Sequence, residues 1–338
     1  MPVQAAAADL KRLVGRLAGR RVLVAGDVIL DEYLIGATTR LSREAPVPVL
    51  EFEARRLIAG GAANPAANIA VLGGVALQVG VVGADAEADA LRATLSERGI
   101  ETGGLFVDQA RPTTVKTRIM AQMGLRFPQQ VARLDKISRA PLDAALTQQI
   151  VEFAAAQITT MDAVLLSDYQ SGFLTPPLVA QICALAAAAG VLCTADAQGQ
   201  FDKYSGLGIV KCNADEARAY LNRDLRTDDD FAQAAVDLRA RLALTVGMVI
   251  TRGADGATFA TAAGEAGRSP APAITDVFDT VGAGDTAIAV ITLALAAGAH
   301  LSQAALLANY ASGVVVRRVG NYAPTPAEVI AALDGSLR

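Results

Sequence analysis

The feature of the sequence that most constrains the fold is a regular alternation of short apolar runs with longer helical patterns. The runs lack the polar alternation of half-exposed strands, and such continuous apolar runs are typical of strands buried on both faces. They occupy residues 21–28, 76–82, 163–167, 191–195, 209–212 and 246–251, and helical patterns lie between them over residues 91–98, 177–189 and 232–242. The alternation predicts an α/β protein of three layers, α/β/α, with helices on both faces of a mostly parallel central sheet.

Two segments depart from this rhythm. Residues 33–56 and 113–135 alternate apolar with polar residues, as strands exposed on one face do. Because each segment is inserted between elements of the core, we expect the two to form a small separate β-sheet that stands off the main sheet.

Composition argues against several classes of function. The net charge is −4 and only 4% of the residues are aromatic, so we expect no nucleic-acid partner. The longest apolar run, residues 287–299, is shorter than the ~20 residues of a membrane helix, so we expect no membrane span. The N-terminal residues resemble a charged amphipathic helix rather than a signal peptide, which favours a cytoplasmic protein. One His and three widely spaced Cys do not form the pattern of a zinc or disulfide site.

A glycine-rich turn precedes an apolar helix predicted near the C-terminus. Gly282 and Gly284 flank Ala283, and the N–H groups of such a turn converge with the helix dipole on a point that suits an anion. Asp285 would follow in the first helical turn, where it could accept a proton from a hydroxyl that attacks a phosphoryl group. The alternative is a tight turn whose acid only favours the dipole. The sequence contains neither the Walker A pattern nor a dinucleotide fingerprint after its first strand.

A second turn of small residues lies after the first inserted segment. Gly60 and Gly61 permit the close approach of a ligand or another backbone, and Asn64 is a candidate N-cap with Pro65 at the first helical position. Asp31 comes shortly after the first strand, near the sheet edge where open α/β proteins bind ligands. Capping alone would explain Asn64, and an acid can simply end a strand.

Three further motifs end predicted strands, and each has two interpretations. Asn213 and Glu216 have the spacing of a capping box, although the carboxylate could instead reach a hydrated Mg²⁺. Asp168, at the end of AVLLSD, also has two interpretations, a structural role and a ligand-binding role. Arg252 could pair with a phosphate or be solvated.

The two small-residue turns, GGAANPAAN and DTVGAGD, resemble the two signatures of the ribokinase-like, or PfkB, carbohydrate kinases. The resemblance covers nearly the whole chain. It implies one ribokinase-like domain over residues 1–338, with a β-sheet lid formed by the inserted segments 33–58 and 112–136. Within the family, GDVILDEY, SREAPVPV and LLSDYQSG are most similar to the kinases of heptose 7-phosphate.

The resemblance also implies roles for individual residues. Asp285 is then the catalytic base, and the anion hole consists of Gly282, Ala283 and Gly284. The residues that match sugar-contacting positions are Asp31, Gly60, Gly61, Asn64, Asn68 and Asp168. Those that match ATP-handling positions are Asn213, Arg252, Gly253, Gly256 and Asn309.

The expected activity is ATP-dependent transfer of a phosphoryl group to a hydroxyl of a sugar or sugar phosphate, with heptose 7-phosphate as one candidate. The resemblance implies ATP as co-substrate and Mg²⁺ held through water by Glu216, and Asp279 falls near a site that holds a monovalent cation such as K⁺ in some members. The lid implies a homodimer. The alternatives are a kinase of an unphosphorylated sugar such as ribose or fructose, a nucleoside kinase, and a non-catalytic sugar or nucleotide sensor.

The sequence departs from the heptose kinases in two places. Their Asp-Pro-Lys-Gly turn is Asp196-Ala-Gln-Gly199 here, so a basic residue is missing where a substrate phosphate would be bound. The lid segment is longer over residues 123–130. Positive charge near that segment comes instead from Lys116, Arg118, Arg126 and Arg133.

Overall fold

The computed structural model describes residues 3–122, 128–274 and 276–335, and in this part of the chain the strands form two sheets. The larger sheet has nine strands in the order β13-β12-β11-β10-β9-β8-β1-β4-β5. They are β1 (Arg21–Gly26), β4 (Val75–Val82), β5 (Glu101–Val107), β8 (Ala163–Ser167), β9 (Leu192–Asp196), β10 (Ile209–Asn213), β11 (Gly247–Thr251), β12 (Ala257–Thr261) and β13 (Ala266–Ser269). Two pairs near one edge, β11 with β12 and β12 with β13, are antiparallel, and the other pairs of this sheet are parallel, which confirms the mostly parallel sheet predicted from the sequence. The apolar runs did not reveal the edge strands β5 and β13 or the strand β12 next to β13, because these strands are short or interrupted by Gly and polar residues.

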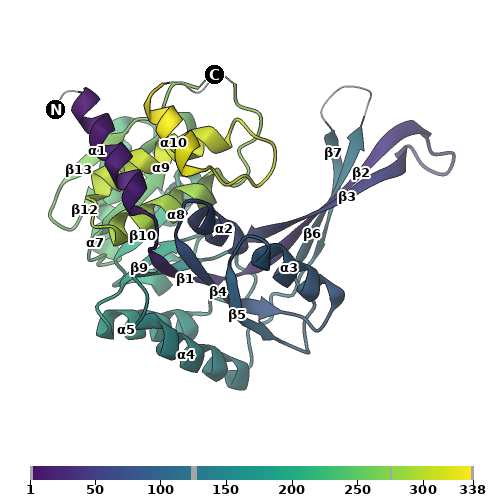
Figure 1. Ribbon diagram of the computed structural model, residues 1–338, viewed down its shortest axis with the longest axis horizontal. Helices are drawn as coiled ribbons and strands as arrows, with labels where there is room; N and C mark the ends of the chain where they lie inside the picture. The colour runs from purple at the N-terminus through teal and green to yellow at the C-terminus, as the bar shows by residue number, and fades with distance from the viewer. Residues whose placement is uncertain (1–2, 123–127, 275, 336–338) are drawn as a thin grey trace.

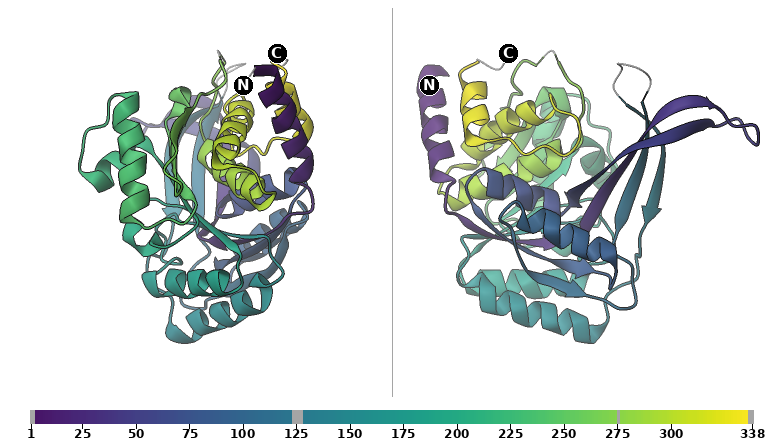
Figure 2. Two further views of the ribbon diagram at one scale, coloured as in Figure 1. Left: turned by 90° about the vertical axis from the view of Figure 1, so that its left-hand side faces the viewer. Right: turned by 45° about the vertical axis from the view of Figure 1, so that its right-hand side comes forward.

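Helices cover both faces of this sheet, as Figures 1 and 2 show. In β1, Val22 and Val24 join one apolar core while Leu23 and Ala25 join the other, so the strand is buried on both sides. On the first face lie α1 (Val3–Arg16), α2 (Ala63–Val71), α3 (Ala86–Ser96), α8 (Ala283–Ala296), α9 (Leu301–Val315) and α10 (Pro326–Leu333). On the second lie α4 (Ala144–Ile158), α5 (Pro176–Ala188), α6 (Ala214–Leu221) and α7 (Asp228–Arg241). Two short 3₁₀ turns, Phe201–Tyr204 and Gly253–Asp255, complete the helical elements that the structure describes.

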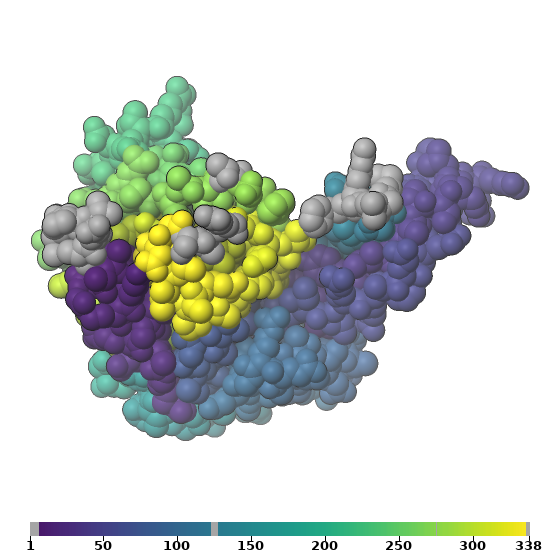
Figure 3. Space-filling model, turned by 45° about the horizontal axis from the view of Figure 1, so that its top comes forward, coloured from purple at the N-terminus to yellow at the C-terminus, as the bar shows by residue number. Residues whose placement is uncertain are grey.

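The smaller sheet is the lid. It contains β2 (Val28–Leu41), β3 (Pro48–Gly61), β6 (Val115–Gln122) and β7 (Gln129–Lys136), in the order β3-β2-β6-β7. Figure 3 shows it projecting from the body as an arm. β2 starts directly after β1, so the sheet begins before the segment predicted from residue 33. Residues 123–127, which include Arg126 and part of the longer lid segment expected at 123–130, lie outside the residues that the structure describes.

Polar residues gather at the carboxyl ends of the central parallel strands. Gly26 of β1, Ser167 of β8 and Asp196 of β9 are level with one another in the parallel ladders, and Asn213 of β10 is level with Thr251 of β11. β1 lies between β8 and β4. The sheet continues to β5 on the β4 side and to β9 and β10 on the β8 side, so the strand order reverses its direction at β1. Open α/β sheets bind ligands outside the strand ends at such a switch point. None of the helices in the described ranges is long and apolar enough to cross a membrane.

Candidate active site

Asp285 lies at the start of α8, beside this sheet edge. Gly282 caps the helix with φ of +82°, a left-handed conformation that suits glycine, and Asp285 is the third helical residue. Its side chain is buried, with 8% of the residue exposed. One carboxylate oxygen, Oδ1, accepts a hydrogen bond from the Tyr169 hydroxyl at 2.6 Å, and the other, Oδ2, accepts one from the Asn64 amide at 2.7 Å. Two donors from different elements therefore fix the orientation of this carboxylate.

Asn64 is not the N-cap that the sequence suggested. α2 begins at Ala63, and its N-cap, Ala62, makes no side-chain hydrogen bond. The Asn64 amide turns inward to Asp285 instead, because Asn68 one turn later donates to the Asn64 carbonyl at 3.0 Å and to its Oδ1 at 3.3 Å. Thr286 in turn donates to Asn68 Oδ1 at 2.8 Å. Asn68 is fully buried behind Asn64, where it supports the residues around Asp285, and its contact with a substrate stays a prediction.

The glycines before α2 make room for Asp31. A Cβ on Gly60 would lie 2.1 Å from Asp31 Oδ2, so no larger residue fits there without movement. Arg118 of the lid strand β6 donates to Asp31 Oδ1 at 2.6 Å, and Asn321 donates to Oδ2 at 2.8 Å. Asp31 lies on the lid strand β2, so its bond with Asn321 ties the lid to the body. Gly61, with φ of +56°, is buried in the same turn and offers no side chain to a ligand.

A buried ion pair lies on the other side of Asp285. Lys211 Nζ of β10 is 2.9 Å from both carboxylate oxygens of Asp196, at the end of β9. A Cβ on Gly284 would lie 3.0 Å from the same ammonium, so Lys211 reaches the first turn of α8. The sequence reasoning missed Lys211, although a lysine inside the apolar run IVKC was a usable signal. It also missed Tyr169, which directly follows the acid that it did select.

Burial dominates the electrostatics of this cluster. Burial, together with the nearby Asp196 carboxylate, raises the pKa of Asp285 to about 6, although Tyr169, Asn64 and Lys211 oppose the shift. Burial also raises the pKa of Asp196, and the Lys211 ammonium acts against it. For Lys211, the Asp196 carboxylate outweighs the effect of burial and raises the pKa, so the ammonium keeps its charge.

Asn213 and Glu216 form the capping box that their spacing allowed. Asn213 Oδ1 accepts the Glu216 N–H at 2.9 Å, and Glu216 Oε2 accepts the Asn213 N–H at 2.7 Å, at the start of α6. The capping role leaves both residues in the lining of a cavity of about 380 Å³ that also reaches Lys211 and Asp285. Burial raises the pKa of Glu216.

A second cavity, of about 540 Å³, meets the first at the start of α8. The two share Thr251, Thr280 and Gly284 as lining residues. The second cavity is mainly apolar, and its lining includes Gly253, Gly256, Pro272, Ile274, Ala283, Val316 and Asn309. Three residues predicted to handle ATP, together with Ala283 of the predicted anion hole, therefore lie around one cavity.

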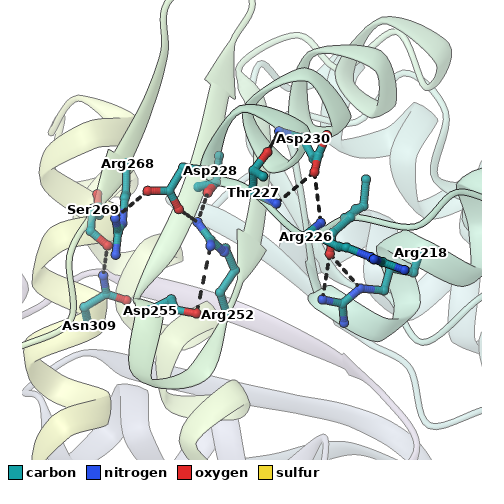
Figure 4. A network of polar contacts seen from close by, with 12 residues as sticks. Arg218, Arg226, Thr227, Asp228, Asp230, Arg252, Asp255, Arg268, Ser269 and Asn309 are labelled. Carbon is teal, nitrogen blue, oxygen red and sulfur yellow. Dashed lines mark hydrogen bonds and ion pairs between the residues drawn. The ribbon is translucent and has the colours of Figure 1, made fainter.

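Arg252 differs from the other residues predicted to handle ATP, because its side chain is already paired and covered, and its role in phosphate binding stays a prediction. Its guanidinium donates to Asp228 at 2.7 Å, packs over the Phe231 ring at 4.2 Å and is only 6% exposed, because α7 covers it. Figure 4 shows this network, in which Arg268 also pairs with Asp228. In the same view, Asn309 donates to the Ser269 carbonyl.

Asp168 is also placed differently from the prediction. It is buried, and its Oδ2 accepts from the Tyr204 hydroxyl at 2.7 Å and lies 2.7 Å from Lys203 Nζ. These partners give Asp168 a structural role. The residue does not line either of the two cavities. Asp279 accepts the N–H groups of Val281 and Gly320 and so joins two loops near the site, while its role with a monovalent cation stays a prediction.

Comparison with known proteins agrees with this geometry. A model of the pfkB family of carbohydrate kinases matches residues 20–328, and the chain belongs to that family. The bifunctional protein HldE of Trichlorobacter lovleyi is 36% identical over 326 residues, and HldE of Caulobacter vibrioides is 41% identical over 332. These alignments cover 96% and 97% of this chain but 65% and 66% of the relatives. The chain therefore spans just under two thirds of the length of these curated relatives.

Solved structures share the fold at low sequence identity. The structure of Arabidopsis thaliana ribokinase complexed with ribose and ATP superimposes with a TM-score of 0.71 at 19% identity and covers 94% of this chain and 99% of its own. Phosphofructokinase-2 of Escherichia coli in complex with fructose-6-phosphate gives 0.75 at 19%, with 95% and 100% covered. The ribokinase-like fold with its lid sheet, predicted from the sequence motifs, is confirmed.

Proposed function

We propose that this carbohydrate kinase transfers the γ-phosphoryl group of ATP to a hydroxyl of a sugar phosphate, with heptose 7-phosphate as the first candidate. The observation that carries the proposal is the position of Asp285, at the junction between two cavities and at the N-terminus of α8. The apolar cavity suits an adenine ring, and the polar one, which Lys211 and Asp285 line, suits a phosphoryl group and the sugar that receives it. A hydroxyl and a phosphoryl group would then meet beside the buried carboxylate.

In the proposed mechanism, Asp285 accepts the proton of the attacking hydroxyl. The hydroxyl oxygen forms a bond to the γ-phosphorus while the bond from phosphorus to the bridging oxygen breaks, and ADP leaves. The N–H groups at the start of α8 and the Lys211 ammonium stabilise the negative charge on the phosphoryl oxygens. The Glu216 carboxylate, half-buried in the polar cavity, fits a hydrated Mg²⁺, which when bound neutralises phosphate charge.

The charges on the lid support a phosphorylated substrate rather than a neutral sugar. Arg118 is level with Arg133 in the ladder between β6 and β7, and Lys116 is two residues from Arg118 along β6, so all three point to one face. This face is turned toward the body, since the Lys116 ammonium lies 5.3 Å from the ring of Tyr169, in the loop after β8. The face presents three cations, of which Arg118 pairs with Asp31 and Arg133 with Asp135, while Lys116 lies over the Tyr169 ring. We propose that these cations bind a substrate phosphate in place of the lysine missing from the Asp196–Gly199 turn.

The experiment that tests the proposal is a screen for ATP consumption. Heptose 7-phosphate, hexoses, pentoses, their phosphates and nucleosides would be compared at equal concentration, with ADP release as the readout. The proposal requires the highest kcat/KM with a sugar phosphate. A preference for an unphosphorylated sugar or a nucleoside would overturn the substrate assignment, and ATP binding without turnover on any of them would support a sensor.

Activity should depend on the ionisation of Asp285. Because burial raises the pKa of this carboxyl to about 6 and the base acts only when ionised, kcat/KM should fall as pH drops through 6 and level off above about 7. An unperturbed Asp, with a pKa near ~3.9, would keep full activity at pH 5. The measurement is kcat/KM from pH 5 to 9, with circular dichroism at each pH to exclude unfolding. A flat profile down to pH 5 would contradict the prediction.

The outer face of the lid supports the expectation of a homodimer. Leu134 is level with Thr117, one residue from Lys116, so it points away from the body, and it is 68% exposed. Phe52 and Leu41, also on the lid, are 70% and 69% exposed. We expect a second copy of the chain to cover these residues, because apolar surface of this kind marks an interaction site.

A substitution on the lid tests this dimer. Leu134→Asp should convert the protein from dimer to monomer in sedimentation analysis, whereas Val236→Asp, on the body helix α7 at 37% exposure, should leave the dimer intact. A monomeric unmodified chain, or a dimer that survives Leu134→Asp, would show that the lid is not the interface.

A further inference from the structure

Tyr169 connects the lid to Asp285. Its hydroxyl donates to Asp285 Oδ1 at 2.6 Å, and its ring lies 5.3 Å from the ammonium of Lys116 on the lid strand β6. A single side chain thus contacts the proposed base with its hydroxyl and a lysine of the lid with its ring. In the described part of the chain, the other side chain that donates to Asp285 is that of Asn64, which lies in the body on α2.

Hydrogen bonds to Asp27 fix the backbone around Tyr169. Asp27, which follows β1, accepts the N–H groups of Tyr169 at 2.8 Å, Ser171 at 3.1 Å and Phe173 at 3.1 Å. These three donors oppose the effect of burial, which raises the pKa of Asp27. On the other side, Asp168 accepts the Gln170 N–H at 2.9 Å. The loop after β8 therefore has little freedom, and the position of the Tyr169 hydroxyl is set by the body of the protein.

We infer that Tyr169 is a positioning residue that orients the Asp285 carboxylate, and that Lys116 of the lid stabilises the productive orientation through the Tyr169 ring. This inference rests on the proposed role of Asp285 as base. The hydroxyl donates to one carboxylate oxygen, which still has a lone pair for the substrate proton, and the ring accepts the lid cation on its face. Placement of the lid and orientation of the base are thereby linked through one aromatic side chain.

Besides Tyr169, two charged groups and one amide face Asp285, and each of them affects the pKa that a pH profile would report. Asp196 at the end of β9 favours the protonated form, and Lys211 of β10 favours the ionised form. Asn64 of α2 also donates to the carboxylate. None of these changes when only the Tyr169 hydroxyl is removed, so Tyr169→Phe isolates one donor. Loss of a donor to the charged form raises the pKa of the carboxyl.

The experiment is a double-mutant cycle of Tyr169→Phe and Lys116→Met. Tyr169→Phe should lower kcat about ten-fold with little change in the KM for ATP, because a hydrogen bond to a charged group is lost, and the acidic limb of kcat/KM should shift to higher pH. Lys116→Met should lower kcat about three-fold in the unmodified chain, but should have almost no further effect on kcat in Tyr169→Phe. Any direct contact of Lys116 with the sugar would appear in the KM for the sugar instead.

A second measurement does not depend on activity. In protein labelled with ¹³C at aspartate carboxyl groups, the signal lost in Asp285→Asn identifies the base, and its titration is followed by NMR. The inference requires this titration to move to higher pH in Tyr169→Phe. An unchanged titration with unchanged kcat would overturn the role of Tyr169, and additive effects on kcat would overturn the link to Lys116. Failure of the proposed function gives a different result, namely turnover that survives Asp285→Asn.

Discussion

Asp285→Asn is expected to lower kcat by about a hundred- to ten-thousand-fold while ATP still binds. The substitution keeps the shape of the side chain but removes the oxygen that accepts the hydroxyl proton, and general base catalysis contributes about 10²–10⁴-fold in rate. The Asn amide can still accept from Asn64 and donate to the Tyr169 oxygen, so the local hydrogen bonds survive. The measurements are steady-state kinetics and calorimetric titration with ATP. Turnover close to that of the unmodified chain would remove Asp285 as the base.

Loss of activity in this variant should not come from unfolding. Burial raises the pKa of Asp285 to about 6, so at pH 8 its ionised form opposes folding, and the neutral Asn should give a Tm at least as high. Asp276→Asn is a matched control, because that carboxylate lies in the loop before α8, is mostly exposed and makes only a distant pair with Arg317 at 3.9 Å. We expect this control to keep both its kcat and its Tm.

Lys211→Met is expected to destabilise the protein by about 3–5 kcal/mol, because it leaves the buried Asp196 carboxylate without its partner. The corresponding fall in Tm is on the order of 10 °C for a chain of this size. The same change should lower kcat about a hundred-fold, since a positive charge next to the first turn of α8 is lost. Thermal unfolding and kinetics below the transition temperature measure the two effects separately.

A second variant and a control separate stability from catalysis. The double substitution Asp196→Asn with Lys211→Met removes both charges, so most of the stability should return while kcat stays low. Lys11→Met breaks a partly exposed ion pair with Asp334 and should cost no more than about 1 kcal/mol. Full recovery of kcat in the double variant would show that Lys211 serves stability alone, and an unchanged Tm in Lys211→Met would contradict the account of a buried pair.

The sequence predicted the central strands well because their periodicity is a local property. The runs at residues 163–167 and 209–212 correspond to β8 and β10 within one residue, since a strand buried on both faces must be apolar throughout. The edge strand β13 does not need to be apolar throughout, and its sequence AGRS did not indicate a strand. The turn before α8 was also predicted, because Gly282 requires a left-handed conformation that few other residues adopt.

Local sequence patterns could not predict which side chains pair with one another in the folded protein. Asn64 has the spacing of an N-cap, yet its amide bonds Asp285, which is 221 positions away in the sequence. Arg252 follows a strand like a phosphate ligand, yet α7 supplies Asp228 and Phe231 to cover it. In both cases a residue that satisfies one local rule has a stronger partner that only the packed fold supplies.

The sequence by itself therefore determined the layered α/β fold, the lid and the position of Asp285 at a helix start, because strand burial, alternation and glycine turns are encoded within a few neighbouring residues. The tertiary structure alone decided which groups surround that carboxylate. Tyr169 and Lys211 come from separate strand ends and reach Asp285 only because parallel pairing aligns β8, β9 and β10 at one edge of the sheet. Burial at that junction, which no local pattern specifies, is also what raises the pKa of the proposed base.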